Sequence, residues 1–274
     1  MRSQAYKLLV LDDSFLMQTV RNAFYFVCGM CSLLLLWSWV SHATLNEIPG
    51  VTKTWEVFKT LYADAFYFNP ENAADEGIGW KLWDSIQRVL LGFTLGSIVA
   101  IPLGMIMGSN KMLMNILNPV VQILRPVSPL VWFILGQIAL KSSPGALIFM
   151  IFITSLWPTL INTSFGVASI PDDHKNVGKA FGFSTWKYVT KIAIPFAMPH
   201  IITGLRLSIG IAWMVIFAGE MLSGDSGIGS FAWESYNGGN YENILSALLI
   251  IGLVGVLLDK GFSALQQSFA YDKK

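Results

Sequence analysis

The sequence predicts an all-α, polytopic integral membrane protein with about six transmembrane helices. Of its 274 residues, 54% are hydrophobic and only 13% are charged, which is about half the charged fraction of an average soluble chain. Apolar stretches long enough to cross roughly 30 Å of hydrocarbon as a helix recur along the chain. These stretches cover approximately residues 22–40, 86–108, 116–140, 146–167, 199–222 and 244–262.

The first apolar stretch is expected to remain in the protein as a membrane anchor. Its core, from Phe24 to Val40, is longer than the roughly 7–15 residues of a signal-peptide core, and a long leader precedes it. Cleavage after the small residues at 41–43 is the alternative. Cys28 and Cys31 form a C-x-x-C in this stretch, but a redox site would need a strand-to-helix context, so we interpret them as small packing residues.

The long segment 41–85 is expected to lie on the outer side of the membrane. Its first part places apolar side chains at helical spacing, which predicts a helix along the membrane interface. These side chains are Trp55, Phe58, Leu61 and Tyr62. The stretch "NPENAADEGIGW" that follows is typical of an acidic, turn-rich loop.

Two features of the later stretches concern helix packing. Small residues four positions apart allow helix backbones to approach closely in lipid. Such pairs are Gly92 and Gly96, Gly104 and Gly108, and Gly204 and Ser208. The stretch 116–140 contains Pro119, Pro126 and Pro129, and because proline interrupts the helical hydrogen-bond ladder, we expect a bent or broken helix there.

The basic residues of the loops predict that both chain termini are cytoplasmic. Eleven basic residues fall on one side: Arg2, Lys7, Arg21, Lys111, Lys175, Lys179, Lys187, Lys191, Lys260, Lys273 and Lys274. Only four fall on the other: Lys53, Lys59, Lys81 and Lys141. Three more lie inside or at the edge of spans: Arg88, Arg125 and Arg206.

The longest cytoplasmic segment between spans, 171–190, is predicted to form two short helices separated by Gly182. Ser169 and Asp172 have capping-box spacing, and the second helix is expected to begin at Ser184. Apolar and basic residues fall on different faces of both helices. The pattern fits either an interfacial helix pair resting on anionic headgroups or a docking surface for a cytoplasmic partner.

Several functional classes are not supported. A net charge of +1 gives no basic footprint for nucleic acid. No G-x-x-x-x-G-K-[ST] phosphate loop, nucleophile elbow or dinucleotide fingerprint occurs, and His42, His174 and His200 lack zinc-ligand spacing. We therefore expect no catalytic residue and no metal site. The paired aspartates at 12–13 and 172–173 are expected to serve turns or helix caps.

A motif in the cytoplasmic segment resembles a known family. Gly182, nine residues and then Ile192-Ala193-Ile194-Pro195 is similar to the signature E-A-A-x3-G-x9-I-x-L-P of binding-protein-dependent ABC importer permeases, with Asn176, Val177 and Gly178 in the E-A-A places and Ile194 in place of leucine. Over residues 79–263, blocks such as "NPVVQILRPVSPL" and "IPFAMPHIITGLRLSIGIAWMVIFAGEML" resemble the nitrate, sulfonate, taurine and bicarbonate group. The blocks "FNPENAADEGIGW" and "FAWESYN" are similar to the nitrate and bicarbonate permeases.

The resemblance implies a type I ABC importer permease fold in a bacterial inner membrane. It implies a second permease copy, an external binding protein or lipoprotein, and separate ATPase subunits that bind ATP and Mg²⁺, with no cofactor in this chain. The implied division is 1–78 for the tail, first span and outer segment, 79–263 for the transmembrane core, and 264–274 for the cytoplasmic tail. The implied docking residues are Asp172, Asp173, Asn176, Val177, Gly178, Phe181, Gly182 and Pro195.

On this resemblance the substrate is a small inorganic oxyanion. Nitrate or nitrite comes first, then bicarbonate, then cyanate, sulfonate or taurine. An autonomous secondary anion transporter is the alternative of a different class, but the internal repeats typical of that class are not visible.

Ionisable and polar residues within spans are candidates for the anion pathway, since they are costly in a membrane. Arginine offers a forked donor array to a planar anion, and hydroxyl and amide groups add donors. The candidates are Arg125, Ser128, Asn162 and Arg206. Glu220 and Trp213 are expected to form a gate or to pack, and Arg88 is expected to pair with Asp84 at i,i+4.

Overall fold

The computed structural model describes residues 2–71 and 75–269, and only the backbone of residues 2–16 and 19. Throughout this part of the chain the regular elements are helices. They are α1 (Arg2–Ala43), α2 (Val51–Ala63), α3 (Ile78–Ser109), α4 (Lys111–Leu124), α5 (Pro129–Leu140), α6 (Ser143–Ala168), α7 (Asp172–Ala180), α8 (Thr185–Tyr188), a π-helical segment (Val189–Ala193), α9 (Ile194–Ser223), α10 (Ile228–Asn237) and α11 (Tyr241–Phe269). The all-α prediction is confirmed.

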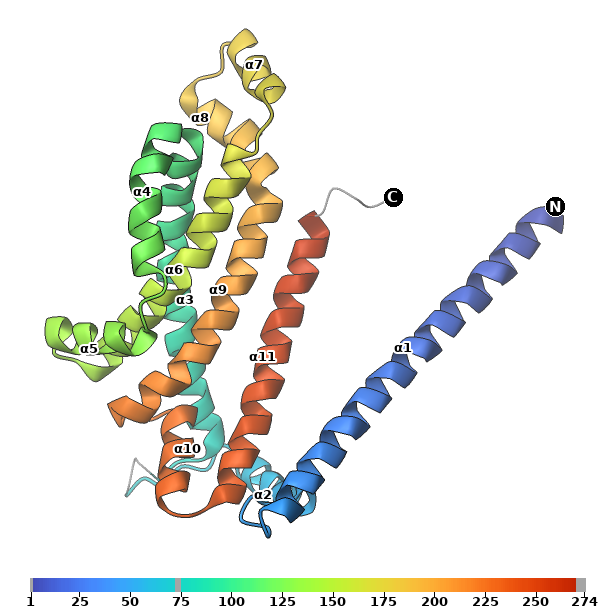
Figure 1. The fold of residues 1–274 in the computed structure, drawn as a ribbon, viewed down its shortest axis with the longest axis vertical. Helices are drawn as coiled ribbons and strands as arrows, with labels where there is room; N and C mark the ends of the chain where they lie inside the picture. Colours follow the sequence, from blue (N-terminus) through green and yellow to red (C-terminus); the bar gives the residue numbers. More distant parts are fainter. Residues whose placement is uncertain (1, 72–74, 270–274) are drawn as a thin grey trace.

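Helices α3, α6 and α9 form the centre of the bundle (Figure 1). The glycines of α3 allow this packing because a Cβ at Gly104 would lie 2.7 Å from the Leu160 carbonyl oxygen on α6, and one at Gly96 would lie 2.7 Å from the Ser155 Oγ. A Cβ at Gly92 would lie equally close to Ile151. The predicted role of these small residues in close helix packing is confirmed.

Helix α9 approaches α6 through the third small-residue pair, Gly204 and Ser208. A Cβ at Gly204 would lie 2.9 Å from the Thr159 Cα. One turn further, the Ser208 hydroxyl donates to the Ser155 carbonyl and lies 2.8 Å from the Thr159 hydroxyl. These interhelical hydrogen bonds add to van der Waals packing in a medium where apolar side chains have no preference for protein over lipid.

Five helices of the described chain are long and apolar enough to cross a membrane, and α4 and α5 together make a sixth, bent candidate. The bend between α4 and α5 is 94°, so the predicted break in the third stretch is confirmed. The break falls at residues 125–128, before Pro129, whereas Pro119 lies inside α4 without ending it. The helical segment begins earlier than predicted, at Lys111, because Asn110 caps it by accepting from the amides of Met112 and Leu113.

The two ends of the bundle carry different short helices. Helices α7 and α8 project at the end where α1 begins and α11 finishes, and α2 and α10 lie at the opposite end (Figure 1). Lys273 and Lys274, used above to predict orientation, lie outside the described residues, as do residues 72–74 of the acidic loop. The side chains of Arg2 and Lys7 are likewise undescribed.

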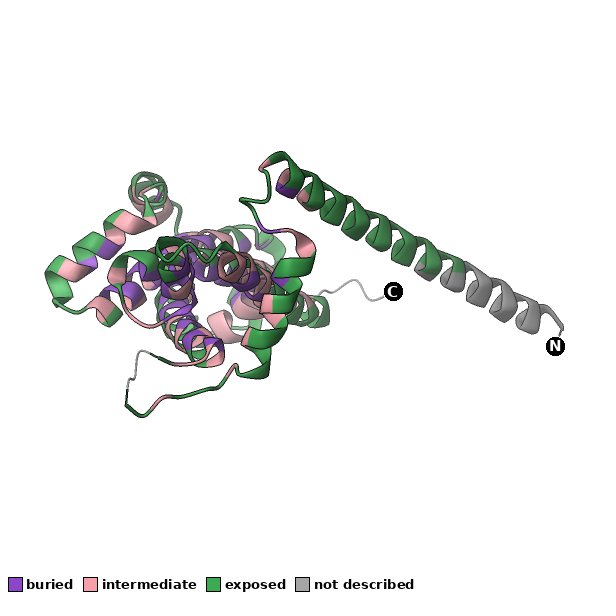
Figure 2. Cartoon of the chain, turned by 90° about the horizontal axis from the view of Figure 1, so that it is seen from below, coloured by how far each residue is buried: buried purple, intermediate pink, exposed green. Residues whose placement is uncertain are grey.

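Helix α1 stands apart from the bundle (Figure 1), and its main contact within the described part of the chain is with α2. Its described side chains are almost all exposed, whereas the buried residues gather in the central helices (Figure 2). The predicted outer helix exists as α2, with Trp55, Phe58 and Tyr62 stacked along it. Phe58 and Leu61 pack against Ile228 and Ile250 of the bundle, so α2 joins α1 to the core.

Candidate coupling loop and anion pathway

The loop between α6 and α9 is a helix, a glycine turn and a second helix. Gly182 has a left-handed backbone with φ of 61°. Its amide donates to the Lys179 carbonyl and the Phe183 amide donates to the Gly178 carbonyl, which is the Schellman arrangement that ends a helix. The Ser184 hydroxyl then accepts from the Lys187 amide and starts α8, as the sequence predicts.

The start of α7 differs from the predicted capping box. Its N-cap is Pro171, which makes no side-chain cap, and the Ser169 hydroxyl donates back to the Gly166 carbonyl at 2.9 Å. The box fails because Ser169 still belongs to the end of α6, which leaves its side chain facing its own helix. Asp172 bonds Lys175 at 3.0 Å, and this hydrogen bond and the lysine charge lower the pKa of the Asp172 carboxyl from its ordinary value.

Apolar side chains project from this loop into open space. Phe181 is 73% exposed, Trp186 is 76% exposed and Val177 is half exposed. Gly178 is buried instead, because the Tyr188 and Ile192 side chains of the second helix cover it. Large exposed apolar groups at the tip of a protein are typical of an interaction surface.

The second half of the loop is continuous with a transmembrane helix. Helix α8, the π-helical segment and α9 form one helical rod, Thr185–Ser223. Pro195 lies in the first turn of α9, where a missing amide donor costs little, and Pro199 lies one turn further. The α7–α8 loop is therefore connected to α9 by continuous helical backbone.

The candidate anion residues come from separate elements, and no hydrogen bond joins them to one another in the described part of the chain. Arg125 and Ser128 are exposed at the bend between α4 and α5. Asn162 is half buried on α6, and its amide donates to the Pro158 carbonyl at 2.8 Å. Arg125 is thus an exposed candidate, and no hydrogen bond or ion pair is formed by its side chain among the described residues.

Arg206 makes a close pair with a residue that the sequence pattern did not single out. Its guanidinium donates to both carboxylate oxygens of Asp259 on α11, at 2.7 and 2.8 Å, and to Gln266 at 3.2 Å. The two partners are 53 positions apart, so no local spacing could have indicated the pair. Arg206 therefore joins α9 to α11.

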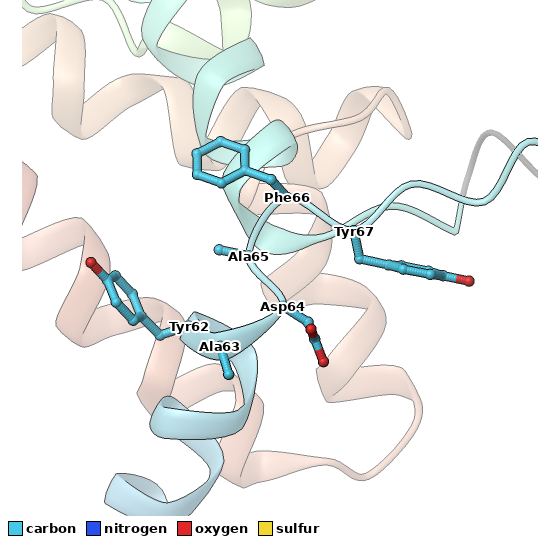
Figure 3. Close-up of a pocket in the computed structure, with 6 residues that line it drawn as sticks. All are labelled: Tyr62, Ala63, Asp64, Ala65, Phe66 and Tyr67. Atoms are coloured by element: carbon cyan, nitrogen blue, oxygen red, sulfur yellow. The ribbon is translucent and has the colours of Figure 1, made fainter.

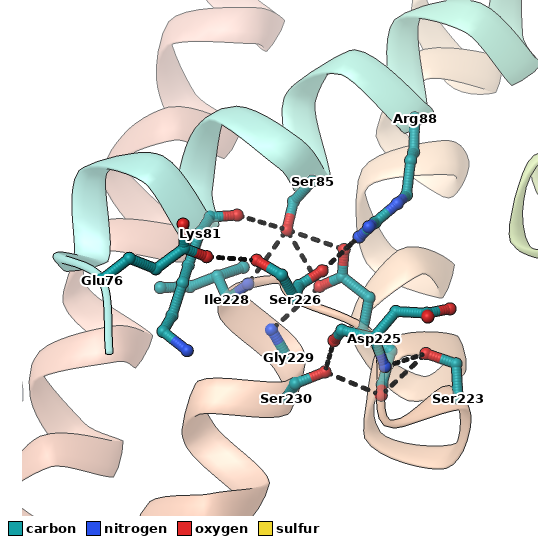
Figure 4. Close-up of polar contacts among 11 residues, drawn as sticks. Glu76, Lys81, Ser85, Arg88, Ser223, Asp225, Ser226, Ile228, Gly229 and Ser230 are labelled. Atoms are coloured by element: carbon teal, nitrogen blue, oxygen red, sulfur yellow. Dashed lines mark hydrogen bonds and ion pairs between the residues drawn. The ribbon is translucent and has the colours of Figure 1, made fainter. Parts of the chain in front are cut away.

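Glu220 is the centre of a buried polar network near the opposite end of α9. It is fully buried, accepts from the Ser85 hydroxyl and the Arg88 guanidinium, and also accepts from the Gly229 amide at 3.0 Å. Arg88 also donates to the Ser226 carbonyl. Figure 4 shows how residues of α3 and of the α9–α10 connection, among them Ser85, Arg88 and Gly229, meet in this network.

The predicted Asp84–Arg88 pair is wrong. Arg88 pairs with Glu220 at 2.9 Å, and no ion pair between Arg88 and Asp84 exists among the described residues. The reason is that Arg88 faces α9 and α10, where a buried carboxylate needs a cation, while a solvent-side i,i+4 pair contributes little. The start of α10 adds to the site, since its first amides donate to Ser85 and Glu220.

Trp213 serves packing between α9 and α11. Its indole donates to the Ile251 carbonyl at 3.0 Å, and the ring lies against Gly255, where a Cβ would be 3.3 Å from it. Trp213 also makes an edge contact with Phe217. Trp213 and Glu220 therefore lie in two separate sites. Trp213 packs against α11, and Glu220 belongs to the buried polar network with Ser85 and Arg88.

One hollow of the described surface has a lining that includes none of these residues. It encloses about 530 Å³ and is lined by residues 62–67 at the connection from α2 to α3 (Figure 3). Its charged lining group is the Asp64 carboxylate, which disfavours an anion. Within the described chain no three histidine, cysteine, aspartate or glutamate side chains gather as metal ligands.

Comparison with known families decides the identity. Residues 100–270 match the family model described as "Binding-protein-dependent transport system inner membrane component". The chain belongs to this family. It is a membrane permease subunit of an ABC transporter, and a multi-pass inner membrane protein.

Individual relatives narrow the branch of the family. The bicarbonate transport system permease CmpB of Synechocystis sp. is 41% identical over 89% of this chain and 88% of that protein. The nitrate import permease NrtB of Leptolyngbya laminosa is 36% identical over 88% of this chain and 86% of that protein. The permease is therefore a member of the nitrate/bicarbonate group.

The fold agrees with a solved ABC transporter. An inward-facing MetNI methionine transporter chain superposes with a TM-score of 0.63 over 70% of this permease and 96% of that chain, at 15% identity. The predicted type I permease fold is confirmed.

Proposed function

We propose that this permease forms the translocation pathway for a small planar inorganic oxyanion, driven by separate ATPase subunits that dock on the α7–α8 loop. The observation that carries the proposal is the projecting helix–Gly182–helix elbow with exposed Phe181 and Trp186, joined without interruption to α9. It lies at the same end as the start of α1 and the end of α11, and it carries four loop lysines, which supports a cytoplasmic location for this end.

Nitrate is the first substrate candidate and bicarbonate is its rival, since a nitrate import permease is 36% identical to this chain and a bicarbonate transport permease is 41% identical. Both anions are flat and carry one negative charge, so the same forked arginine donor suits both. A second permease copy would complete the pathway. An external binding protein would deliver the anion.

Competition uptake separates the two substrates. Cells that express the whole complex are expected to take up labelled nitrate with saturation, and excess bicarbonate is expected to compete weakly. The reverse order assigns the permease to bicarbonate. The absence of saturable uptake of either anion, with nitrite and cyanate included as competitors, contradicts the substrate proposal.

Gly182→Val is expected to uncouple ATP hydrolysis from transport or to release the ATPase. Nothing lies within 4 Å of a Cβ at this position, so the cost is conformational: a β-branched residue in a left-handed backbone loses about 1–2 kcal/mol. Gly182→Asn is the matched control because asparagine tolerates this backbone. Transport-coupled ATPase activity in proteoliposomes is the measurement, and equal coupling in both variants would contradict a docking role for the turn.

Arg125→Gln and Arg206→Gln are expected to fail in different ways. Loss of the exposed Arg125 fork should reduce anion uptake at least roughly tenfold while the purified complex stays intact. Loss of Arg206 should leave Asp259 without its partner and lower the amount of folded permease, with the apparent KM for uptake unchanged. An uptake defect confined to Arg206→Gln, at normal protein level, would reverse the assignment.

A further inference from the structure

We propose that the groove between α7 and α8 receives an acidic segment of the partner ATPase, while Phe181 and Trp186 insert into apolar surface beside it. This inference rests on the proposed docking function and specifies the chemistry of the partner. It assigns the attraction to lysines of this permease and carboxylates of the ATPase.

The groove is a defined hollow at the tip of the projecting loop. It encloses about 310 Å³ and separates the two short helices. It is lined by Lys175, Gly178, Lys179, Phe183, Thr185 and Tyr188. The small Gly178 forms its floor, where Tyr188 and Ile192 of the second helix meet the first.

The charges around this groove are mainly positive. Lys179 makes no ion pair among the described residues, and the Lys187 ammonium lies 4.4 Å from the centre of the Phe183 ring that lines the groove. Lys175 bonds Asp172 outside the groove but remains 40% exposed. Residues 171–191 contain four lysines and two aspartates. An acidic segment of a partner would therefore complement the charge of this loop.

A protein partner fits this surface better than a lipid surface. The sequence of α7, DDHKNVGKA, has few apolar residues, and its first turn carries Asp172 and Asp173, which an anionic headgroup layer would repel. Phe181 and Trp186 are both more than 70% exposed and flank the turn, the arrangement of aromatic anchors at a protein interface. Asn176, exposed on α7, adds no negative charge.

The test is assembly of the complete complex with charge-reversed permease. Lys179→Glu/Lys187→Glu is expected to weaken ATPase retention at least roughly tenfold, and Lys179→Arg/Lys187→Arg is expected to retain it. Wild-type assembly should weaken with added salt, and Lys179→Gln/Lys187→Gln should lose most of that salt dependence. Lys53→Glu/Lys59→Glu, on α2 at the other end, is the matched control with the same change of charge.

Two further measurements separate the possible failures. Cross-linking from Phe181→Cys to the ATPase reports docking itself. If the cross-link forms but the charge-reversed permease assembles as the wild type does, the inference is overturned and the docking proposal stands. If no cross-link forms, the docking proposal fails. A loss of retention that occurs only in nanodiscs with anionic phospholipid, and not in those of neutral phospholipid, would assign the lysines to lipid instead and also overturn the inference.

Discussion

Glu220→Ala is expected to cost the folded permease about 3–5 kcal/mol, because it leaves the Arg88 guanidinium without its carboxylate partner in a buried site. The same change leaves the Ser85 hydroxyl and the Gly229 amide without their acceptor. Three helices meet at this carboxylate, so the loss should spread from α9 to α3 and α10. Thermal unfolding of the purified permease in mild detergent, followed by tryptophan fluorescence, is the measurement.

A double-mutant cycle isolates the pair itself. Arg88→Met/Glu220→Met is expected to be less destabilised than the sum of its single variants, because the double variant buries no unpaired charge. Asp84→Asn is the matched control: it removes a carboxylate four residues from Arg88 that makes no ion pair with it among the described residues, and should change the unfolding temperature little. Additive effects in the cycle, or a large effect of Asp84→Asn, would contradict the assigned pairing.

Gly104→Leu is expected to prevent close packing of α3 against α6 and to abolish most folded protein. A Cβ at this position already meets the Leu160 carbonyl oxygen and the Thr163 Cβ at 2.7 Å, and backbone atoms cannot rotate out of the way. Overpacking a tight contact costs roughly 1–3 kcal/mol even where side chains can adjust, and leucine adds three further carbons beyond Cβ. Gly96→Leu should have a comparable effect on the same interface.

Gly252→Leu provides the matched control for the α3 variants. Gly252 also lies in a membrane helix, α11, but nothing lies within 4 Å of a Cβ built there. Its replacement should leave the elution profile of the detergent-solubilised permease unchanged, whereas Gly104→Leu should give aggregated material. Equal behaviour of the two variants would show that the glycine contact between α3 and α6 does not limit folding.

The break in the third apolar stretch, 116–140, shows how much of the structure local sequence patterns can predict. Pro119, Pro126 and Pro129 predicted a break somewhere within 116–140, because each removes an amide from the ladder and restricts the preceding residue. The angle of 94° between α4 and α5 was beyond this reasoning. It depends on how α5 packs against α6, where Gly136 approaches Ala146.

The α7–α8 loop was the most predictable of the candidate sites. Its helix end depends on one glycine and its second helix on one serine, and both act on amides within five positions along the chain. The predicted capping box at Ser169 was wrong even in this loop. A capping pattern in the sequence does not reveal that the preceding helix, α6, extends to Ala168.

The sequence by itself determined the membrane class, the helical fold, the positions of the spans, the glycine elbow and the family resemblance, because each depends on composition, periodicity or short spacing. Only the tertiary structure decided which charges meet. Glu220 and Arg88 are 132 positions apart, and Arg206 and Asp259 are 53 apart. Each pair depends on the rotation and neighbours of whole helices, and a buried charge accepts whichever partner that packing brings within hydrogen-bond distance.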